Sequence, residues 1–173
     1  MELEKVRDIK LLLLDADGVL TEGKVVYNDE GMESKSFDVK DGHGLKLLMR
    51  SKIDVAIITG RESKALLHRA KDLGIGMVYQ KAINKIIIYD QILKDKNLED
   101  REVCYVGDDL VDLPLLRRVG FAVAVADGVD EVKEGADYIT RKEGGKGAVR
   151  EVCELILKAQ NKWKEVTDRY FNL

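Results

Sequence analysis

The sequence of 173 residues contains one proline and two cysteines. The single proline, Pro114, leaves no proline-rich linker, and no repeat or low-complexity stretch divides the chain, so we expect one domain over residues 1–173. Cys104 lies in an apolar run and Cys153 in a predicted helix, and their spacing is not that of a metal site. We therefore expect two buried thiols rather than a disulfide.

The chain also lacks a strong excess of either charge and any long apolar run. Its formal net charge is −3, and no run of lysine and arginine indicates a nucleic-acid partner. The first ten residues are mostly charged, and the apolar run after them is too short for a signal peptide or a membrane span. We therefore expect neither nucleic acid nor a membrane as a partner, and a cytoplasmic location.

The most informative segment that is present is the apolar run Leu11–Leu14, which leads directly into Asp15 and Asp17. Such a run is typical of a central strand in a parallel sheet with both faces covered. Open α/β sheets bind their ligands at the carboxyl ends of the strands. Two carboxylates there would repel each other unless a cation, a proton or a basic side chain joined them. Oxygen ligands of this kind suit Mg²⁺, so we predict a metal-assisted enzyme.

Strand and helix patterns alternate along the rest of the chain. This alternation predicts an α/β fold, a Rossmann-like three-layer sandwich with a parallel sheet. Further strands are expected at residues 55–58, 77–79, 103–106, 121–125 and 138–140. Helices are expected at residues 45–50, 63–73, 85–94, 113–119, 129–133 and from about residue 148.

Residues 24–37 depart from this alternation. They contain two stretches of strand-forming residues around a glycine-containing turn, which predicts a β-hairpin directly after the first acidic loop. The hairpin is too small to be a cap domain. A site without a lid indicates either a large substrate or a pocket that another subunit completes.

Four predicted strand ends carry side chains that suit phosphoryl transfer through an aspartyl-phosphate. We predict that Asp15 attacks phosphorus and that Asp17 serves as general acid and then as general base. Thr59 and Lys85 are expected to bind the phosphoryl oxygens and to neutralise their charge. Asp15, the backbone carbonyl of Asp17, and Asp108 are expected to hold Mg²⁺.

Several neighbouring residues have more than one interpretation. Gly60 and Arg61 are predicted to bind substrate, because arginine can make a bidentate contact with a carboxylate or phosphate; the alternative for Arg61 is a surface arginine at the start of a helix. Asp109 either holds a metal-bound water or caps the next helix, and Asp112 either caps that helix or supports the site. Lys146, in a glycine-rich segment, either contacts substrate or lies in an ordinary loop before a helix.

Two further features are open at this stage. His43 lies between two glycines and is a candidate acid–base group, although Asp17 already fills that role. The C-terminal tail, residues 161–173, mixes aromatic and charged residues and is expected to be either frayed or docked on a neighbouring subunit.

The motifs named above resemble those of the haloacid dehalogenase superfamily of phosphatases, and the resemblance covers nearly the whole chain. It rests on Asp15-x-Asp17-Gly-Val-x-Thr21, Thr59-Gly-Arg61, Lys85 and Gly107-Asp108-Asp109, in that order. Further segments are similar to the capless 3-deoxy-D-manno-octulosonate 8-phosphate phosphatases of that superfamily. These segments are residues 37–44, 79–80, 107–114, 123–127 and 144–151.

The resemblance implies a magnesium-dependent homotetramer that acts on a small phosphorylated sugar acid and releases the free sugar acid for lipopolysaccharide synthesis. It also implies that hairpins pack across subunits, that a neighbouring chain helps to close each pocket, and that the tail docks on a neighbour. Lys81 and Glu22 depart from the family, which usually has glycine and aspartate at these positions. These departures leave the details of the substrate open.

Three alternatives are compatible with parts of this pattern. The first is a phosphatase for a nine-carbon, sialic-acid-type 9-phosphate, or one of broad specificity. The second is a phospho-accepting signalling module, which Asp17 argues against because a second aspartate supplies the acid–base group that promotes turnover. The third is a non-catalytic relative, which the intact set of candidate residues argues against.

Overall fold

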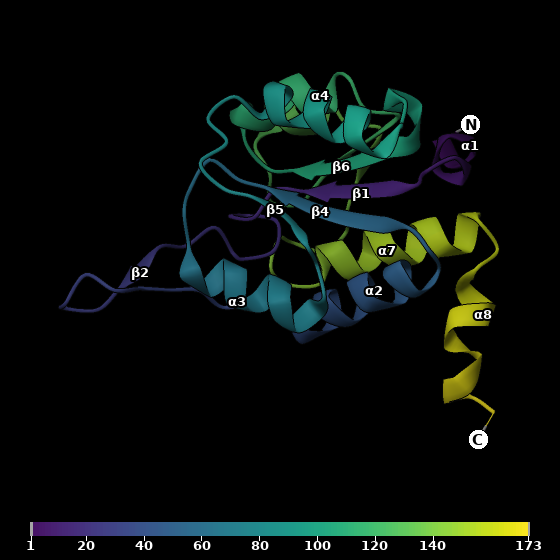
Figure 1. The fold of residues 1–173 in the computed structure, drawn as a ribbon, viewed down its shortest axis with the longest axis horizontal. Helices are drawn as coiled ribbons and strands as arrows, with labels where there is room; N and C mark the ends of the chain where they lie inside the picture. The colour runs from purple at the N-terminus through teal and green to yellow at the C-terminus, as the bar shows by residue number, and fades with distance from the viewer. Residues whose placement is uncertain (1, 173) are drawn as a thin grey trace.

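The computed structural model describes residues 2–172 and contains a six-stranded parallel sheet and a separate two-stranded hairpin (Figure 1). The strand order in the sheet is β5-β4-β1-β6-β7-β8. These strands are β1 (Leu11–Leu14), β4 (Asp54–Ile58), β5 (Met77–Tyr79), β6 (Val103–Gly107), β7 (Phe121–Ala124) and β8 (Tyr138–Ile139). The predicted α/β fold with a parallel sheet is confirmed.

The helices are α1 (Glu2–Arg7), α2 (Val39–Arg50), α3 (Lys64–Leu73), α4 (Lys85–Lys96), α5 (Leu113–Leu116), α6 (Asp130–Glu134), α7 (Ala148–Ala159) and α8 (Trp163–Thr167). Short 3-10 turns lie at Asp100–Glu102, Leu110–Asp112 and Asp168–Tyr170. Across residues 2–172, no helix combines the length and the apolar character needed to cross a membrane.

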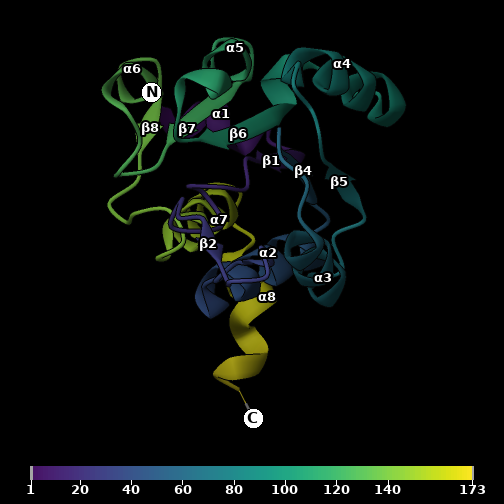
Figure 2. The ribbon, with the colours of Figure 1, turned by 90° about the vertical axis from the view of Figure 1, so that its left-hand side faces the viewer.

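Helices cover both faces of the sheet, which gives three layers (Figure 2). Side chains alternate between the two faces of a strand. Leu12 and Leu14 therefore belong to a core with α2, α3 and α7. Leu11 and Leu13 belong to a second core with α4, α5 and α6. Burial of all four leucines explains why β1 is an unbroken apolar run.

The register of the sheet brings the polar strand ends to one edge. Leu14 pairs with Ile57 of β4 on one side and with Val106 of β6 on the other. The residues that follow these strands, among them Asp15 and Asp108, therefore leave the sheet at the same level.

The hairpin consists of β2 (Val26–Tyr27) and β3 (Glu33–Ser34), which pair antiparallel. The side chain of Asn28 closes its turn by accepting hydrogen bonds from the amides of Glu30 at 3.1 Å and Met32 at 2.8 Å. The hairpin projects from the body of the molecule (Figure 1), and its apolar residues are exposed. It is the insertion that the sequence predicts after the first strand.

Helix α2 begins six residues before the predicted start at residue 45. The side chain of Asp38 caps it by accepting hydrogen bonds from the amides of Lys40 at 2.6 Å and Asp41 at 3.1 Å. Two glycines in the first turns conceal the helical pattern in the sequence. A Cβ atom on Gly44 would lie 3.2 Å from the Cα atom of Arg150, so the missing side chain lets α2 approach α7 closely.

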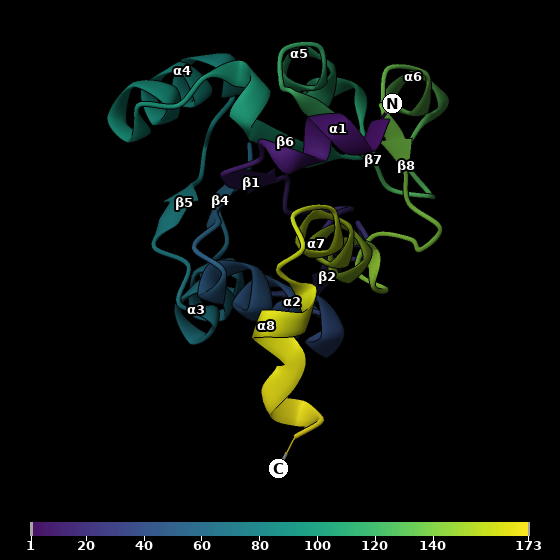
Figure 3. The same cartoon turned by 90° about the vertical axis from the view of Figure 1, so that its right-hand side faces the viewer.

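The tail begins with an ordered helix. Helix α8 packs against α2 and α7 of the same chain, with Val166 and Thr167 buried. The Trp163 ring lies 5.0 Å from the Lys158 ammonium, and beyond α8 the chain runs away from the body (Figure 3). Its first half is therefore not frayed, because apolar burial within the chain holds it. Docking of the tail on a neighbouring subunit stays a prediction.

Candidate active site

A buried lysine joins two aspartates at the carboxyl edge of the sheet. Lys85 begins α4, and its ammonium lies 2.5 Å from Oδ1 of Asp15 and 2.7 Å from Oδ1 of Asp112. It also lies 3.1 Å from the hydroxyl of Tyr105 on β6. The side chain of Lys85 is 6% exposed, so its charge has these carboxylates as partners in place of water. The structure therefore brings together three residues that the sequence placed on separate segments.

Asp112 uses both carboxylate oxygens within the protein. Oδ1 accepts hydrogen bonds from Lys85 and, at 2.6 Å, from the Tyr105 hydroxyl. Oδ2 accepts hydrogen bonds from the backbone amides of Asp108 at 2.9 Å and Asp109 at 3.3 Å. Asp112 thus holds the 3-10 turn after β6 and also contacts Lys85, whereas its side chain makes no cap for helix α5. The sequence analysis missed Tyr105. Since side chains alternate along a strand, its place on β6 puts it on the face of the sheet that α4 covers, where Lys85 begins.

Carboxylate oxygens of Asp15, Asp108 and Asp112 lie within 4.8 Å of one another. Since Asp112 already accepts four hydrogen bonds, Asp15 and Asp108 are the side chains with ligand atoms to offer. When all three are ionised, they carry two more charges than Lys85 neutralises. Two carboxylates with an uncompensated double charge fit a small divalent cation such as Mg²⁺.

Burial and the repulsion of neighbouring carboxylates raise the pKa values of Asp15 and Asp108. Burial, reinforced by the charge of Asp112 and opposed by Lys85, raises the pKa of Asp15 to about 6. Burial, followed by the charges of Asp15 and Asp112, raises the pKa of Asp108 to about 8. Burial opposes the charge of Lys85, but the two aspartates beside it outweigh this effect and raise its pKa. A cation at this point would relieve the cost of ionising both carboxylates.

Gly18 lets the loop after β1 pass against Asp108. Its backbone has φ +89°, and a Cβ atom there would lie 2.0 Å from Oδ2 of Asp108. On the other side, a Cβ atom on Gly144 would lie 1.6 Å from the carbonyl oxygen of Gly18. The glycine-rich segment before α7 therefore packs closely against the loop after β1, and a side chain at Gly144 would prevent this contact.

Asp17 lies next to this cluster but its side chain faces other residues. Its carboxylate contacts the ammonium of Lys35, and its Oδ2 lies 3.6 Å from Nε of Arg61. Arg61 is also paired with Glu33 of the hairpin. Lys35 and Glu33 were missed in the sequence, where a charged residue in an exposed hairpin carries no signal of a site.

Thr59 and Gly60 lie at the end of β4. Thr59 is buried, its amide donates to the carbonyl of Tyr79 at 2.9 Å, and its hydroxyl accepts from the amide of Arg61 at 3.3 Å. Gly60 is exposed and has open space where a Cβ atom would be. Backbone at Gly60 is therefore accessible to a ligand.

The remaining candidate residues take part in local contacts. Asp109 accepts a hydrogen bond from the amide of Leu110 at 2.7 Å, as a helix cap does. The exposed ammonium of Lys146 lies 2.7 Å from Glu143 and 3.6 Å from Glu22. Lys81 pairs with Glu62 at 2.5 Å. All three residues are exposed.

His43 lies on α2 and faces the tail. Its ring centroid is 5.6 Å from that of Tyr170, in an edge-to-face arrangement. Burial and then the charges of nearby arginines lower the pKa of His43. The position and the contact favour a packing role over acid–base chemistry.

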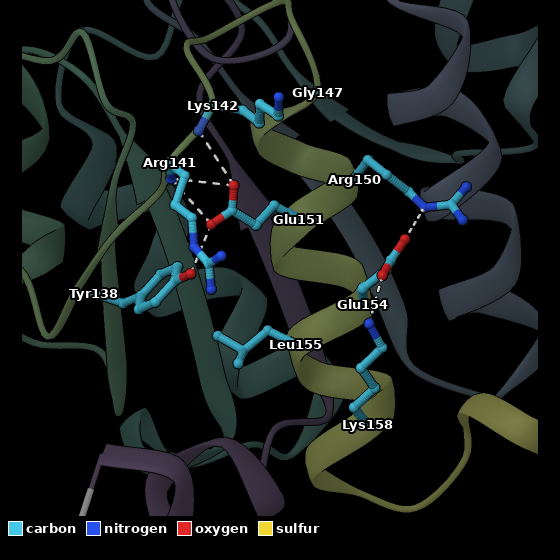
Figure 4. Close-up of a pocket in the computed structure, with 9 residues that line it drawn as sticks. All are labelled: Tyr138, Arg141, Lys142, Gly147, Arg150, Glu151, Glu154, Leu155 and Lys158. Atoms are coloured by element: carbon cyan, nitrogen blue, oxygen red, sulfur yellow. Dashed lines mark hydrogen bonds and ion pairs between the residues drawn. The ribbon is translucent and has the colours of Figure 1, made fainter.

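A cavity of about 460 Å³ lies between β8 and α7, and none of the candidate catalytic residues lines it (Figure 4). Its acidic side chains are already paired. Glu151 accepts a hydrogen bond from the hydroxyl of Tyr138 at 2.6 Å, and Glu154 lies 2.8 Å from Arg150 and 2.7 Å from Lys158. Through Glu151, which also accepts from the amides of Arg141 and Lys142, α7 is therefore linked to β8 and to the loop after it.

A family model of haloacid dehalogenase-like hydrolases matches residues 74–152. The 3-deoxy-D-manno-octulosonate 8-phosphate phosphatase of Escherichia coli K12 is 46% identical over 94% of this chain and 87% of its own. The corresponding phosphatase from Moraxella catarrhalis, solved with a magnesium ion, a phosphate ion and a KDO molecule, has a TM-score of 0.95 and 45% identity, and the alignment covers 97% of both chains.

A third relative is the cobalt-bound deoxy-D-mannose-octulosonate 8-phosphate phosphatase of Haemophilus influenzae. It has a TM-score of 0.90 and 39% identity, with 96% of this chain and 98% of that chain covered. Identity and shape thus agree over almost the full length. The chain belongs to the haloacid dehalogenase superfamily, in the family of the 3-deoxy-D-manno-octulosonate 8-phosphate phosphatases, and is an enzyme that hydrolyses phosphoric monoesters.

Proposed function

We propose that the chain hydrolyses 3-deoxy-D-manno-octulosonate 8-phosphate to the free sugar acid and phosphate, with Mg²⁺ as cofactor. The observation that carries the proposal is the buried contact of Lys85 with Asp15 and Asp112, beside Asp108. It keeps a carboxylate nucleophile and a phosphate-binding cation adjacent in a site with excess negative charge. The family supplies the substrate, since the matching relatives carry this substrate in their names.

In the proposed mechanism, an oxygen of Asp15 forms a bond to phosphorus as the bond from phosphorus to the sugar oxygen breaks. Asp17 gives its proton to that leaving oxygen. Asp17 then takes a proton from the water that attacks the aspartyl-phosphate, which releases phosphate and restores Asp15. The two aspartates follow one strand, so the nucleophile and the acid–base group approach the phosphoryl group together.

Side chains of Asp15 and Asp108, with the backbone carbonyl of Asp17, would hold Mg²⁺, which offsets negative charge on the nucleophile and the phosphoryl group. Lys85, the hydroxyl of Thr59 and the amide of Gly60 bind the phosphoryl oxygens. Asp112 holds Lys85 in place through Oδ1.

Arg61, which is 43% exposed at the mouth, binds the carboxylate of the substrate. Asp109 supports the loop after β6 as a cap, and Lys146 lies on the loop that borders the entrance.

We further propose that residues 1–173 act as one phosphatase domain and assemble into a homotetramer in the cytoplasm, where the product serves as a lipopolysaccharide precursor. The exposed apolar side chains of the hairpin support the assembly, because a contiguous apolar patch is typical of a protein interface. The absence of a cap leaves the pocket to be completed by a neighbouring subunit.

The test is phosphate release from a panel of sugar phosphates with and without Mg²⁺. The panel contains 3-deoxy-D-manno-octulosonate 8-phosphate and a nine-carbon sialic-acid-type 9-phosphate. Asp15→Asn serves as the blank, and Asp130→Asn, at a side chain that is 93% exposed, is the matched control. We expect magnesium-dependent preference for the eight-carbon substrate and turnover only when Asp15 is present.

Equal rates across the panel would contradict the substrate assignment but keep the reaction. Preference for the nine-carbon compound would replace the substrate. Turnover by Asp15→Asn at the wild-type rate would remove Asp15 as nucleophile.

A further inference from the structure

Four charged side chains form a closed ring of alternating charge at the mouth of the site. Lys35 contacts Asp17 and lies 3.2 Å from Oε1 of Glu33. Oε2 of Glu33 pairs with Arg61, whose Nε lies 3.6 Å from Oδ2 of Asp17. Asp17 and Arg61 follow strands of the sheet, whereas Glu33 and Lys35 come from the returning arm of the hairpin. The ring therefore joins the hairpin to the catalytic edge.

The side chains that the hairpin contributes to this ring are largely shielded from water although the hairpin projects from the molecule, and that of Glu33 is 17% exposed. The side chain of Lys35 is 2% exposed, while Val26 and Tyr27 on the opposite arm are more than half exposed. Among the described residues, the buried Oε1 of Glu33 has no hydrogen bond and lies 3.2 Å from the ammonium of Lys35. Removal of these charges from water costs free energy, and buried ion pairs often fail to repay that cost in stability. Their placement thus calls for a role beyond stability.

The two carboxylate oxygens of Asp17 have different contacts within the ring. The ammonium of Lys35 donates a hydrogen bond to Oδ1, whereas Oδ2 lies 3.6 Å from Nε of Arg61, beyond hydrogen-bond distance. Lysine donates and cannot accept a proton, so Oδ1 is engaged and Oδ2 is the oxygen left for proton transfer.

We propose that Lys35 is a positioning residue that fixes the carboxylate of Asp17 for proton transfer to the leaving oxygen, with Glu33 holding Lys35 and Arg61 at their spacing. This inference rests on the proposed function, in which Asp17 is the acid–base group. The hairpin thereby contributes to the chemistry of its own subunit as well as to any contact between subunits.

The experiment compares Lys35→Met and Lys35→Arg with wild type, with Lys24→Met as the matched control. Lys24 lies in the same hairpin, is 74% exposed and pairs with Glu22. For the preferred sugar phosphate, we expect Lys35→Met to lower kcat by about 30-fold with less than about a threefold change in KM, since general acid catalysis contributes on the order of 10²–10⁴. Lys35→Arg should recover most of the lost kcat, and Lys24→Met should match wild type.

A substrate with a good leaving group provides a second readout. p-Nitrophenyl phosphate needs little protonation of its leaving oxygen, so the deficit of Lys35→Met in kcat/KM should be several-fold smaller with this substrate. A purely structural loss would lower kcat/KM for both substrates equally. Light scattering and thermal unfolding of each variant show whether assembly and fold are kept. If Lys35→Met does not fold, Lys35→Gln is expected to show the same dependence on the leaving group.

A rise in KM at unchanged kcat would assign Lys35 to substrate binding and overturn the proposal. Wild-type kinetics, or equal deficits with the two substrates, would overturn it as well. Failure of the proposed function is distinguishable, because it appears in the wild-type enzyme as an absence of phosphate release. Such a result would also overturn the role proposed for Lys35.

Discussion

At the scale of single residues, Lys85 neutralises charge that would otherwise be buried without a partner. Its contacts with Asp15 and Asp112 place one ammonium between two carboxylates in a site that excludes most water. Removing one member of a buried ion pair costs about 3–5 kcal/mol, because the remaining charge stays desolvated. We therefore expect Lys85 to contribute to stability as well as to the phosphate binding proposed for it.

We expect Lys85→Met to lower the free energy of unfolding by about 3 kcal/mol at pH 8 in the presence of a chelator. Mg²⁺ should raise the Tm of this variant by more than it raises that of wild type, since the extra negative charge strengthens cation binding. Differential scanning calorimetry with and without Mg²⁺ measures both effects. Lys94→Met, on the exposed side of α4, is the control. An identical response to Mg²⁺ in Lys85→Met and wild type would contradict the placement of the cation beside Lys85.

A comparison of Gly18 with Gly31 separates the backbone strain of a side chain at positive φ from a steric clash with Asp108. Both have φ values in the left-handed region, +89° and +76°. A Cβ atom on Gly18 would overlap Asp108, whereas one on Gly31 would meet nothing within 4 Å. We expect Gly18→Ala to weaken Mg²⁺ binding by at least about tenfold through displacement of Asp108, and Gly31→Ala to leave it unchanged. Isothermal titration calorimetry measures the affinity, and equal affinity in the two variants would show that Asp108 does not bind the ion.

At the scale of secondary structure, α2 caps α7. Oδ1 of Asp41 accepts a hydrogen bond from the amide of Arg150 at 2.7 Å, and Oδ2 accepts from the amide of Gly147 at 3.4 Å. The N-cap residue Gly147 has no side chain that could do this. A carboxylate on a neighbouring helix thus satisfies amides at the start of α7.

Asp41 also predicts a dependence of stability on pH. Burial raises its pKa from 3.8 to about 6, so between these values the folded state binds more protons than the unfolded state. The contribution of Asp41 is therefore fully present below pH 3.8 and is lost as the pH rises through about 6. Asp41→Asn keeps an acceptor oxygen but does not titrate. We expect its stability relative to wild type to increase by up to about 3 kcal/mol between pH 4 and pH 7.

Urea unfolding of wild type and Asp41→Asn across this pH range measures the difference. Asp72→Asn, at an exposed side chain on α3, serves as the control that should leave the pH profile unchanged. A constant difference between Asp41→Asn and wild type at every pH would contradict a raised pKa for Asp41.

The sheet strands could be predicted from the sequence because their apolar runs depend on local composition. The six strands lie within one or two residues of their predicted ends. Helix boundaries were less accurate where tertiary contacts decide them. Gly42 and Gly44 interrupt the start of α2 in the sequence, yet side chains of α3 at Gly42 and the approach of α7 at Gly44 make glycine favourable there. Helix α8 was missed because it is short and part of its packing surface lies on α2, more than 100 residues earlier in the sequence.

The strand-end aspartates of the site could also be predicted, since parallel strands bring their carboxyl ends to one edge. The contacts of Lys85 with Asp15 and Asp112 agree with that prediction. The assignment of roles to these residues stays a prediction until the variants are measured. Lys35 and Glu33 could not be found this way, because their positions depend on how the hairpin folds back over the edge of the sheet.

At the scale of the whole molecule, the hairpin presents apolar side chains that the chain itself does not cover. Tyr27 and Met32 are 60% and 58% exposed. We expect light scattering to report four chains of 19.5 kDa in the assembled enzyme. Tyr27→Asp should shift the protein toward smaller species, since a charge in an apolar interface is costly to desolvate. Glu30→Lys, at the exposed turn of the same hairpin, is the control, and a monomeric wild type would contradict the assembly.

The position of β1 in the sheet has a consequence for the order of synthesis. β1 is made first among the sheet strands, but its neighbours β4 and β6 lie at residues 54–58 and 103–107. More than 100 residues must therefore be made before Asp15 has both Lys85 and Asp112 beside it. Parallel pairing of distant segments is slow to form, because the long intervening loops must first be ordered. The reactive pocket and the stable fold are thus completed together, so no ribosome-bound fragment that ends before β6 contains a working phosphatase.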